Sequence, residues 1–175
     1  MNFDWLPVLE GTHIRLRPVT EADRDSLYAV AADPLIWAMH PAHDRHLQPV
    51  FDAFLDLAFA DRGGLIVEER ETARMLGFSR YSATRALPGE VEIGWTFLSR
   101  DCWGSGVNAE MKRLMIDHGF RFADRIIFLI GEDNLRSRRA VEKLGATIGP
   151  RTLDAPAAGR TIRHLVYELD REKWR

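Results

Sequence analysis

The segment from Ser99 to Ala109, which reads SRDCWGSGVNA, carries the clearest pattern for chemistry in this chain. It precedes the most regular amphipathic helix of the sequence, and the first turn of a helix presents unpaired backbone N–H groups and the positive end of the helix dipole. Gly104 and Gly106 let the backbone approach a ligand without an intervening Cβ atom. The segment therefore predicts a binding loop for a phosphate-like anion, although a plain glycine turn has the same pattern.

A second basic segment lies at the start of a later helix, which begins Asn134-Leu-Arg-Ser-Arg-Arg139. Positive charge near a helix N-terminus is disfavoured by ~0.3 to 1 kcal/mol for each residue. These arginines therefore indicate either a bound anion or, more simply, solvated side chains. Asn134 is explained equally well as the N-cap of the helix.

Glu92 is the candidate general base. Residues 90–97 alternate between polar and apolar, which predicts a strand, and the apolar face of that strand includes Trp95 and Phe97. We therefore expect Glu92 on the face opposite the aromatic side chains. A carboxylate beside a cleft can accept a proton directly or through water, and burial would raise its pKa. A strand glutamate that simply faces solvent is the alternative.

The remaining reactive side chains predict little chemistry. Cys102 has no evident base beside it in the sequence, and we expect an inert thiol. His40, His43 and His46 lie near Asp44, but their spacing matches no standard metal site, so no metal is expected.

Apolar spacing predicts the elements that position these residues, with a period of two or a short apolar run for strands and spacings of three and four for helices. The expected strands are residues 13–17, 65–68, 75–81, 90–97, 126–130 and 163–169. The expected helices are residues 20–32, 50–62, 106–122 and 134–145. This order implies an α+β fold with a mixed sheet that includes one parallel crossover.

Composition limits the class of protein. A chain of 175 residues with 46% hydrophobic and 29% charged residues predicts one packed domain, residues 1–175. The net charge of −2 argues against a nucleic-acid partner. Its apolar runs are too short to span a membrane, its first residues do not resemble a signal peptide, and it has a single cysteine. We therefore expect a cytoplasmic protein without a membrane partner.

Four segments together resemble a known family: LEGTHIRLRPVTEAD, VEIGW, WGSGVNAE and NLRSRRAVEKLGA. Their order is similar to that of GNAT N-acetyltransferases, and more narrowly to the RimJ/RimL-like group, from about Leu9 to Trp174. The resemblance implies a mostly antiparallel sheet flanked by helices, with a central pair of parallel strands splayed to hold CoA. It also implies direct transfer of acetyl from acetyl-CoA to a primary amine, either a protein N-terminus or a small molecule.

The resemblance assigns roles to particular residues. The CoA pyrophosphate would lie on the backbone of Trp103, Gly104, Ser105, Gly106, Val107 and Asn108. The pantetheine arm would bond the backbone of Phe97, Leu98 and Ser99. Asn134 would line the cleft near the pantetheine, Ser137 would lie near the sulfur, and Arg138 would reach a phosphate. Trp37 and His40 would help to form the acceptor side.

The chain departs from the family pattern at three positions, two of them in this loop. Trp103 and Asn108 differ from the broad signature of the loop, although main-chain contacts can survive such changes. Val141 stands where many members have the tyrosine that acts as general acid, so Ser137 or water would have to protonate the leaving thiol.

Two other functions remain open. A non-catalytic module that binds or senses acyl-CoA would also lack the acid. A dinucleotide-binding enzyme would match Gly104-Ser-Gly106-Val-Asn-Ala109 as G-x-G-x-x-A, but three predicted strands precede the strand that leads into this loop, which is a poor context for that motif. Apolar and aromatic residues near both ends of the chain could support a homodimer.

Overall fold

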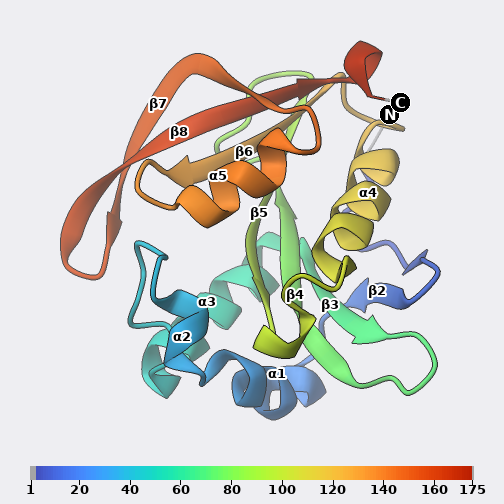
Figure 1. The fold of residues 1–175 in the computed structure, drawn as a ribbon, viewed down its shortest axis with the longest axis vertical. Helices are drawn as coiled ribbons and strands as arrows, with labels where there is room; N and C mark the ends of the chain where they lie inside the picture. The colour runs from blue at the N-terminus through green and yellow to red at the C-terminus, as the bar shows by residue number, and fades with distance from the viewer. Residues whose placement is uncertain (1–2, 175) are drawn as a thin grey trace.

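The computed structural model describes residues 3–174, which form an eight-stranded sheet and five α-helices (Figure 1). The strands are β1 (Leu9–Glu10), β2 (Ile14–Pro18), β3 (Gly64–Glu69), β4 (Met75–Ser82), β5 (Glu90–Leu98), β6 (Arg125–Gly131), β7 (Thr147–Ala157) and β8 (Arg160–Asp170). The α-helices are α1 (Arg24–Ala31), α2 (Pro34–Trp37), α3 (Gln48–Asp61), α4 (Val107–Gly119) and α5 (Leu135–Glu142). Short 3-10 helices cover Glu21–Asp23, Arg100–Cys102 and Arg171–Lys173. Within the described residues, no helix combines the length and the apolar character needed to span a bilayer.

The sheet has the order β1-β2-β3-β4-β5-β6-β8-β7, and every neighbouring pair is antiparallel except β5 and β6. These two parallel strands pair at only three positions, and the last joins Glu92 to Ile127. β5 then continues to Leu98 and β6 continues to Gly131, but the two strands no longer pair with each other. They diverge from this point, as Figure 1 shows. The expected α+β fold with a splayed central parallel pair is confirmed.

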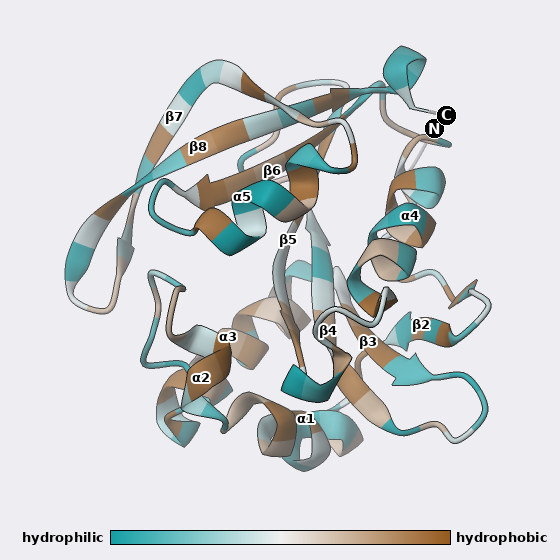
Figure 2. Ribbon diagram, viewed as in Figure 1, coloured by the Kyte–Doolittle hydropathy of each residue, from teal (hydrophilic) through white to brown (hydrophobic). Residues whose placement is uncertain are grey.

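Two apolar clusters hold the helices against the sheet. Met111, Met115 and Ile116 of α4 pack with β2, β3 and β6 in one cluster, which also includes Val141 of α5. Apolar residues of α1 and α3, among them Phe51, pack with β3 and β4 in the other cluster. In Figure 2, β6 is mostly hydrophobic, whereas α5 in front of it is mainly hydrophilic. The helices α4 and α5 therefore share one core, and α1 and α3 share the other.

The alternation expected along residues 90–97 is broken, and the prediction that Glu92 faces away from the aromatic residues is wrong. Trp95 and Thr96 of β5 lie opposite a single residue of β4, and Trp95 adopts φ +55°. Such a β-bulge inserts one residue and changes the face on which later side chains lie. Val91 therefore belongs to the α4 cluster, whereas Trp95 and Phe97 pack in the α1–α3 cluster. Glu92, next to Val91, lies on the same face as Trp95.

The other expected elements are present with shifted ends, and the strands expected at residues 65–68 and 75–81 are β3 and β4, which pair antiparallel. The sequence reasoning did not predict α2, the two-residue β1 or the long strand β7. β7 pairs only with β8 at the edge of the sheet, and its residues are exposed or partly buried throughout. An edge strand of this kind buries no apolar face and tolerates proline, so it leaves no hydrophobic period in the sequence.

Candidate active site

The diverging ends of β5 and β6 form the centre of the candidate site. Because the two strands are parallel, their carboxyl ends lie at the same edge, and the helices that follow, α4 and α5, both begin there. One contact joins the two helix starts: the guanidinium carbon of Arg136 lies 4.2 Å from the centre of the Trp103 ring. The structure therefore brings the glycine loop and the arginine-rich segment together through Arg136.

The glycine loop is open on its outer side. Gly104 and Gly106 have φ values of +78° and +92°, and a Cβ atom added at either position would meet nothing within 4 Å. The positive φ, rather than lack of space, selects glycine here. No side chain caps α4 at Gly106, and within residues 3–174 the N–H groups of Asn108 and Ala109 have no hydrogen-bond acceptor. These free donors suit an anion at the start of α4.

The backbone and side chains beside the loop are already ordered. The indole N–H of Trp103 donates to the Leu98 carbonyl at 3.3 Å. The Ser105 hydroxyl donates to the Cys102 carbonyl at 2.6 Å. The backbone N–H of Ser99 donates to Leu76 at 2.8 Å. These hydrogen bonds fix the loop to the rest of the fold, and the outer face of the loop stays open to a ligand.

At the start of α5, Asn134 is an N-cap in the structure. It is 4% exposed, and its Oδ1 accepts the Ser137 N–H at 3.2 Å. Arg138 donates to the Tyr167 hydroxyl at 2.9 Å and to the Glu132 carbonyl at 2.8 Å. Both of these contacts lie away from the glycine loop. Arg136, rather than Arg138, is therefore the arginine that contacts the loop in this structure.

Glu92 is completely buried in an ion pair with Arg85. Arg85 donates to both carboxylate oxygens of Glu92, with 3.0 Å between Nε and Oε2. Burial raises the pKa of Glu92, and the positive charges of Arg85 and Arg80 oppose this rise. Arg85 occupies one lone pair on each oxygen, so the carboxylate keeps a lone pair on each oxygen that can accept a proton.

Lys112 of α4 is a buried amine that the sequence reasoning did not identify. It is 6% exposed, and its Nζ donates to the Thr96 hydroxyl on β5 at 2.7 Å. The same Nζ lies 5.7 Å from the centre of the Phe128 ring on β6. Burial lowers the pKa of Lys112 to about 7. A signal was present in the sequence, because Lys112 lies three residues before Met115 on the apolar stripe of its helix.

A pocket of about 360 Å³ lies beside the bulge of β5. Its lining includes Arg45, Phe54, Asp61, Arg80, Trp95 and Ala158. The pocket therefore joins α3, the segment before it, β4, β5 and the turn between β7 and β8. The sequence reasoning did not identify these arginines, because only the fold brings them together.

The two residues expected on the acceptor side lie next to this pocket. Trp37 is 1% exposed, its indole N–H donates to the Ala31 carbonyl at 2.7 Å, and Arg45 stacks on its ring. Trp37 therefore supports the pocket from within the core. His40 accepts the Ala42 N–H at 2.9 Å, and burial, aided by the charge of Arg45, holds its pKa well below the ordinary value.

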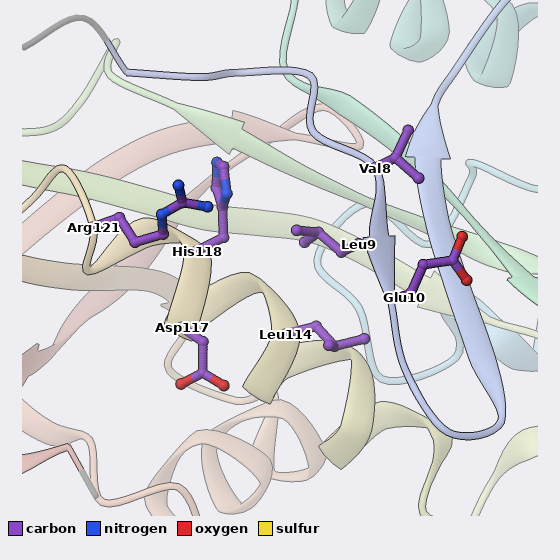
Figure 3. A pocket seen from close by; sticks show the side chains of 7 residues that line it. All are labelled: Val8, Leu9, Glu10, Leu114, Asp117, His118 and Arg121. Carbon is purple, nitrogen blue, oxygen red and sulfur yellow. The ribbon is translucent and has the colours of Figure 1, made fainter.

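A second, smaller cavity of about 270 Å³ lies between β1 and the C-terminal half of α4 (Figure 3). Leu9 and Leu114 point towards each other across it, and Asp117 points away. None of the residues predicted for the site lines this cavity.

Burial raises the pKa of the Cys102 thiol to about 11, as suits an inert cysteine. No group of three or more His, Cys, Asp or Glu side chains within residues 3–174 is placed to hold a metal ion.

Comparison with known proteins identifies the type of fold around this site. A family model described as "Acetyltransferase (GNAT) domain" matches residues 13–147. A Chromobacterium violaceum chain assigned to the GNAT family of acetyltransferases has a TM-score of 0.86 and 19% identity, over 99% of this chain and 90% of that chain. A GCN5-related N-acetyltransferase from Brucella melitensis has a TM-score of 0.81 and 18% identity, over 96% and 80%. Mycobacterium smegmatis RimJ in complex with CoA-disulfide has a TM-score of 0.76 and 17% identity, over 97% and 90%.

Proposed function

The chain belongs to the GNAT family of acetyltransferases, with RimJ among its structural neighbours, and we propose that it transfers acetyl from acetyl-CoA directly to a primary amine. The observation that carries this proposal is the divergence of β5 and β6 beside two helix N-termini, one of which has an open glycine loop. We further propose that residues 1–175 act as one domain.

The residues of this site fit CoA. The free N–H groups at the start of α4 and the open loop from Trp103 to Asn108 suit its pyrophosphate, and Arg136 adds positive charge beside the loop. The backbone of Phe97 to Ser99 would hold the pantetheine arm, and Asn134 would line the cleft beside it. Arg138 would contact a phosphate if it exchanged its bonds to Tyr167 and Glu132. Bound acetyl-CoA supplies an acyl carbonyl that an amine can attack.

The acceptor amine must lose a proton as it is acylated, and Glu92 is our proposed base, acting directly or through water. It lies on the same face of β5 as Trp95, which lines the pocket, and this position supports the role; because Glu92 is completely buried, a bridging water would carry the proton to it. On the other side, the leaving sulfur needs a proton. Ser137, near the start of α5, is one candidate donor, and a second is developed below.

Thermal unfolding with acetyl-CoA, CoA and NAD tests the cofactor. A ligand at about 100 times its Kd stabilises the folded state by roughly 2.7 kcal/mol, which raises Tm by several degrees for a chain of this size. We expect a rise with both CoA species and none with NAD. A response to NAD alone would support the dinucleotide-binding alternative instead.

Turnover tests the reaction. We expect amine-dependent release of free CoA thiol, and a product that resists hydroxylamine, because hydroxylamine cleaves acetyl esters and leaves amides intact. A hydroxylamine-sensitive product would show that the acceptor is a hydroxyl group. Binding of acetyl-CoA without thiol release from any amine would favour the non-catalytic acyl-CoA-binding module.

A further inference from the structure

Two guanidinium groups of the pocket beside β5, buried Arg80 and half-buried Arg45, are left without full ionic partners. Arg80 is 4% exposed, and its guanidinium carbon lies 3.9 Å from the centre of the Trp95 ring. Arg80 pairs with Asp61 through one terminal nitrogen, while its buried Nε has no hydrogen-bond partner within residues 3–174. A buried donor without an acceptor is unfavourable, so this nitrogen indicates a missing ligand atom.

Arg45 is the second such group. Its guanidinium carbon lies 4.7 Å from the Phe54 ring centre and 5.6 Å from that of Trp37. Within the described part of the chain, no carboxylate lies within ion-pair distance of Arg45. Burial lowers its pKa to about 10, and the nearby arginines act in the same direction. A half-buried cation without a carboxylate partner favours an anionic ligand.

The carboxylates around the pocket do not meet this need. Asp61 is engaged by Arg80, and Glu92 is engaged by Arg85. Asp44 lies on the rim and raises the pKa of Arg45, but it forms no ion pair with it. The pocket is therefore lined by the aromatic rings of Phe54 and Trp95 and by two guanidinium groups that keep unused hydrogen-bond donors.

We propose that this pocket binds the carboxylate of the acceptor, so that the substrate is a small amine carrying a carboxylate, of the size of an amino acid. The proposal rests on the proposed function. The pocket volume of about 360 Å³ lies at the lower end of small-molecule sites. Trp95 lines the pocket and also forms the bulge near Glu92, so an amine a few bonds from the carboxylate would reach the diverging strands.

The test compares amino acids with their amides, which keep the amine and remove the negative charge, and with aminoalkyl phosphates of similar length. Wild type, Arg45→Met and the exposed control Arg113→Met are titrated with each compound in the presence of CoA, and KM is measured where turnover occurs. We expect wild type and the control to bind at least one amino acid about tenfold more tightly than its amide, the discrimination typical of a charged hydrogen bond. Arg45→Met should lose this preference while its Kd for acetyl-CoA stays unchanged.

Equal binding of acid and amide by wild type, or an unchanged preference in Arg45→Met, would overturn the proposal. A preference for phosphates over carboxylates would overturn the substrate class. Because the binding arm needs no turnover, an enzyme that binds amino acids but releases no thiol would contradict the proposed function and leave this pocket assignment supported.

Lys112 carries a second, independent inference on the other face of the sheet. Its Nζ lies between the two strands just beyond their last pair, bonded to Thr96 of β5 and near Phe128 of β6. Lys112 has no carboxylate partner within residues 3–174, and Thr96 is partly exposed. The amine therefore lies where β5 and β6 separate. No ion pair with a described residue explains why a lysine is buried there.

The geometry points to Lys112 as the proton donor to the sulfur of CoA, in place of the tyrosine that Val141 does not provide; this inference also rests on the proposed function. As the bond between the acceptor nitrogen and the acyl carbon forms, the carbon–sulfur bond breaks and its electron pair goes to sulfur. Lys112 gives one proton to that sulfur, and the proton lost by the acceptor nitrogen goes to the base on the opposite face. Lys112 regains a proton from solvent after release of the product.

The titration of Lys112 suits this role. Its pKa of about 7 is caused by burial alone, because no charged group of the described elements packed against it contributes. An acid with a pKa near the working pH transfers its proton most effectively.

The test compares CoA with desulfo-CoA, which lacks the sulfur atom, in wild type, Lys112→Met and the exposed control Lys143→Met. At pH 6, where Lys112 is protonated, we expect wild type and control to bind CoA about tenfold more tightly than desulfo-CoA, because the ammonium donates a charged hydrogen bond to the sulfur. Lys112→Met should bind both alike and lose the alkaline limb of its kcat profile. An unchanged affinity ratio, or an unchanged alkaline limb, would assign Lys112 a structural role only.

Discussion

Replacing Lys112 with methionine should stabilise the protein most at low pH, because the native protein buries this charge without a partner. The pKa of Lys112 falls from 10.5 to about 7 on folding. Below pH 7 both the folded and the unfolded chains carry the proton, and the full penalty of burying the ammonium is present. Between pH 7 and pH 10.5 only the unfolded chain holds it, so the stability of wild type rises with pH.

The magnitude follows from the shift. A change of about 3.5 pKa units corresponds to an upper limit of roughly 5 kcal/mol, reduced by ~1 kcal/mol for the lost hydrogen bond to Thr96. Above pH 7 the advantage of Lys112→Met over wild type should shrink by about 1.4 kcal/mol for each pH unit. From pH 7 to pH 9 the difference should therefore narrow by about 2.3 kcal/mol, because Lys112 is already half deprotonated at pH 7.

Urea unfolding of wild type, Lys112→Met and Lys143→Met at pH 6, 7, 8 and 9 measures this difference. Lys143 is exposed in the turn after α5, so its variant should follow wild type at every pH. A difference between Lys112→Met and wild type that stays constant with pH would show that Lys112 titrates normally. That result would refute the reasoning from burial.

Three further predictions follow from the same structure. Gly106→Ala should destabilise the fold by ~1 kcal/mol, measured by urea unfolding, because alanine disfavours the positive φ at this position. The same variant should weaken CoA binding, measured by calorimetry, and an unchanged CoA affinity would count against the loop as the phosphate site. Arg85→Met should remove a charge that opposes the raised pKa of Glu92, so the acidic limb of the rate profile should move to higher pH; an unmoved limb would exclude Glu92 as the titrating base. The pKa of Asp23 is lowered to about 2, chiefly by its hydrogen bond from Arg17, so Asp23 adds stability above pH 3.8 that is lost as the pH falls towards 2. In urea unfolding, Asp23→Asn should therefore lose about 2 kcal/mol of stability at pH 7. A loss that persists unchanged at pH 2 would contradict this assignment.

The sequence was sufficient to predict the fold class and the glycine loop between β5 and α4, because both depend on local signals. Amphipathic spacing defines α4, a short apolar run defines β6, and glycines with positive φ mark the loop between β5 and α4. These are properties of short segments, and long-range packing changes them little.

The acceptor side could not be predicted in the same way. The bulge at Trp95 depends on the register between two strands, and it reverses the face on which Glu92 was expected. Arg45 and Arg80 come from separate segments that meet only in the folded chain. The residues of the proposed acceptor pocket therefore lie where tertiary contacts override the local pattern.

Release of CoA thiol tests the central claim most directly. Purified protein is incubated with acetyl-CoA and a panel of amines that includes amino acids and N-terminal peptides, and free thiol and acetylated product are measured together. The account predicts that thiol release depends on the amine and equals the amount of amide formed. Tight binding of acetyl-CoA with no thiol release from any member of the panel would contradict it.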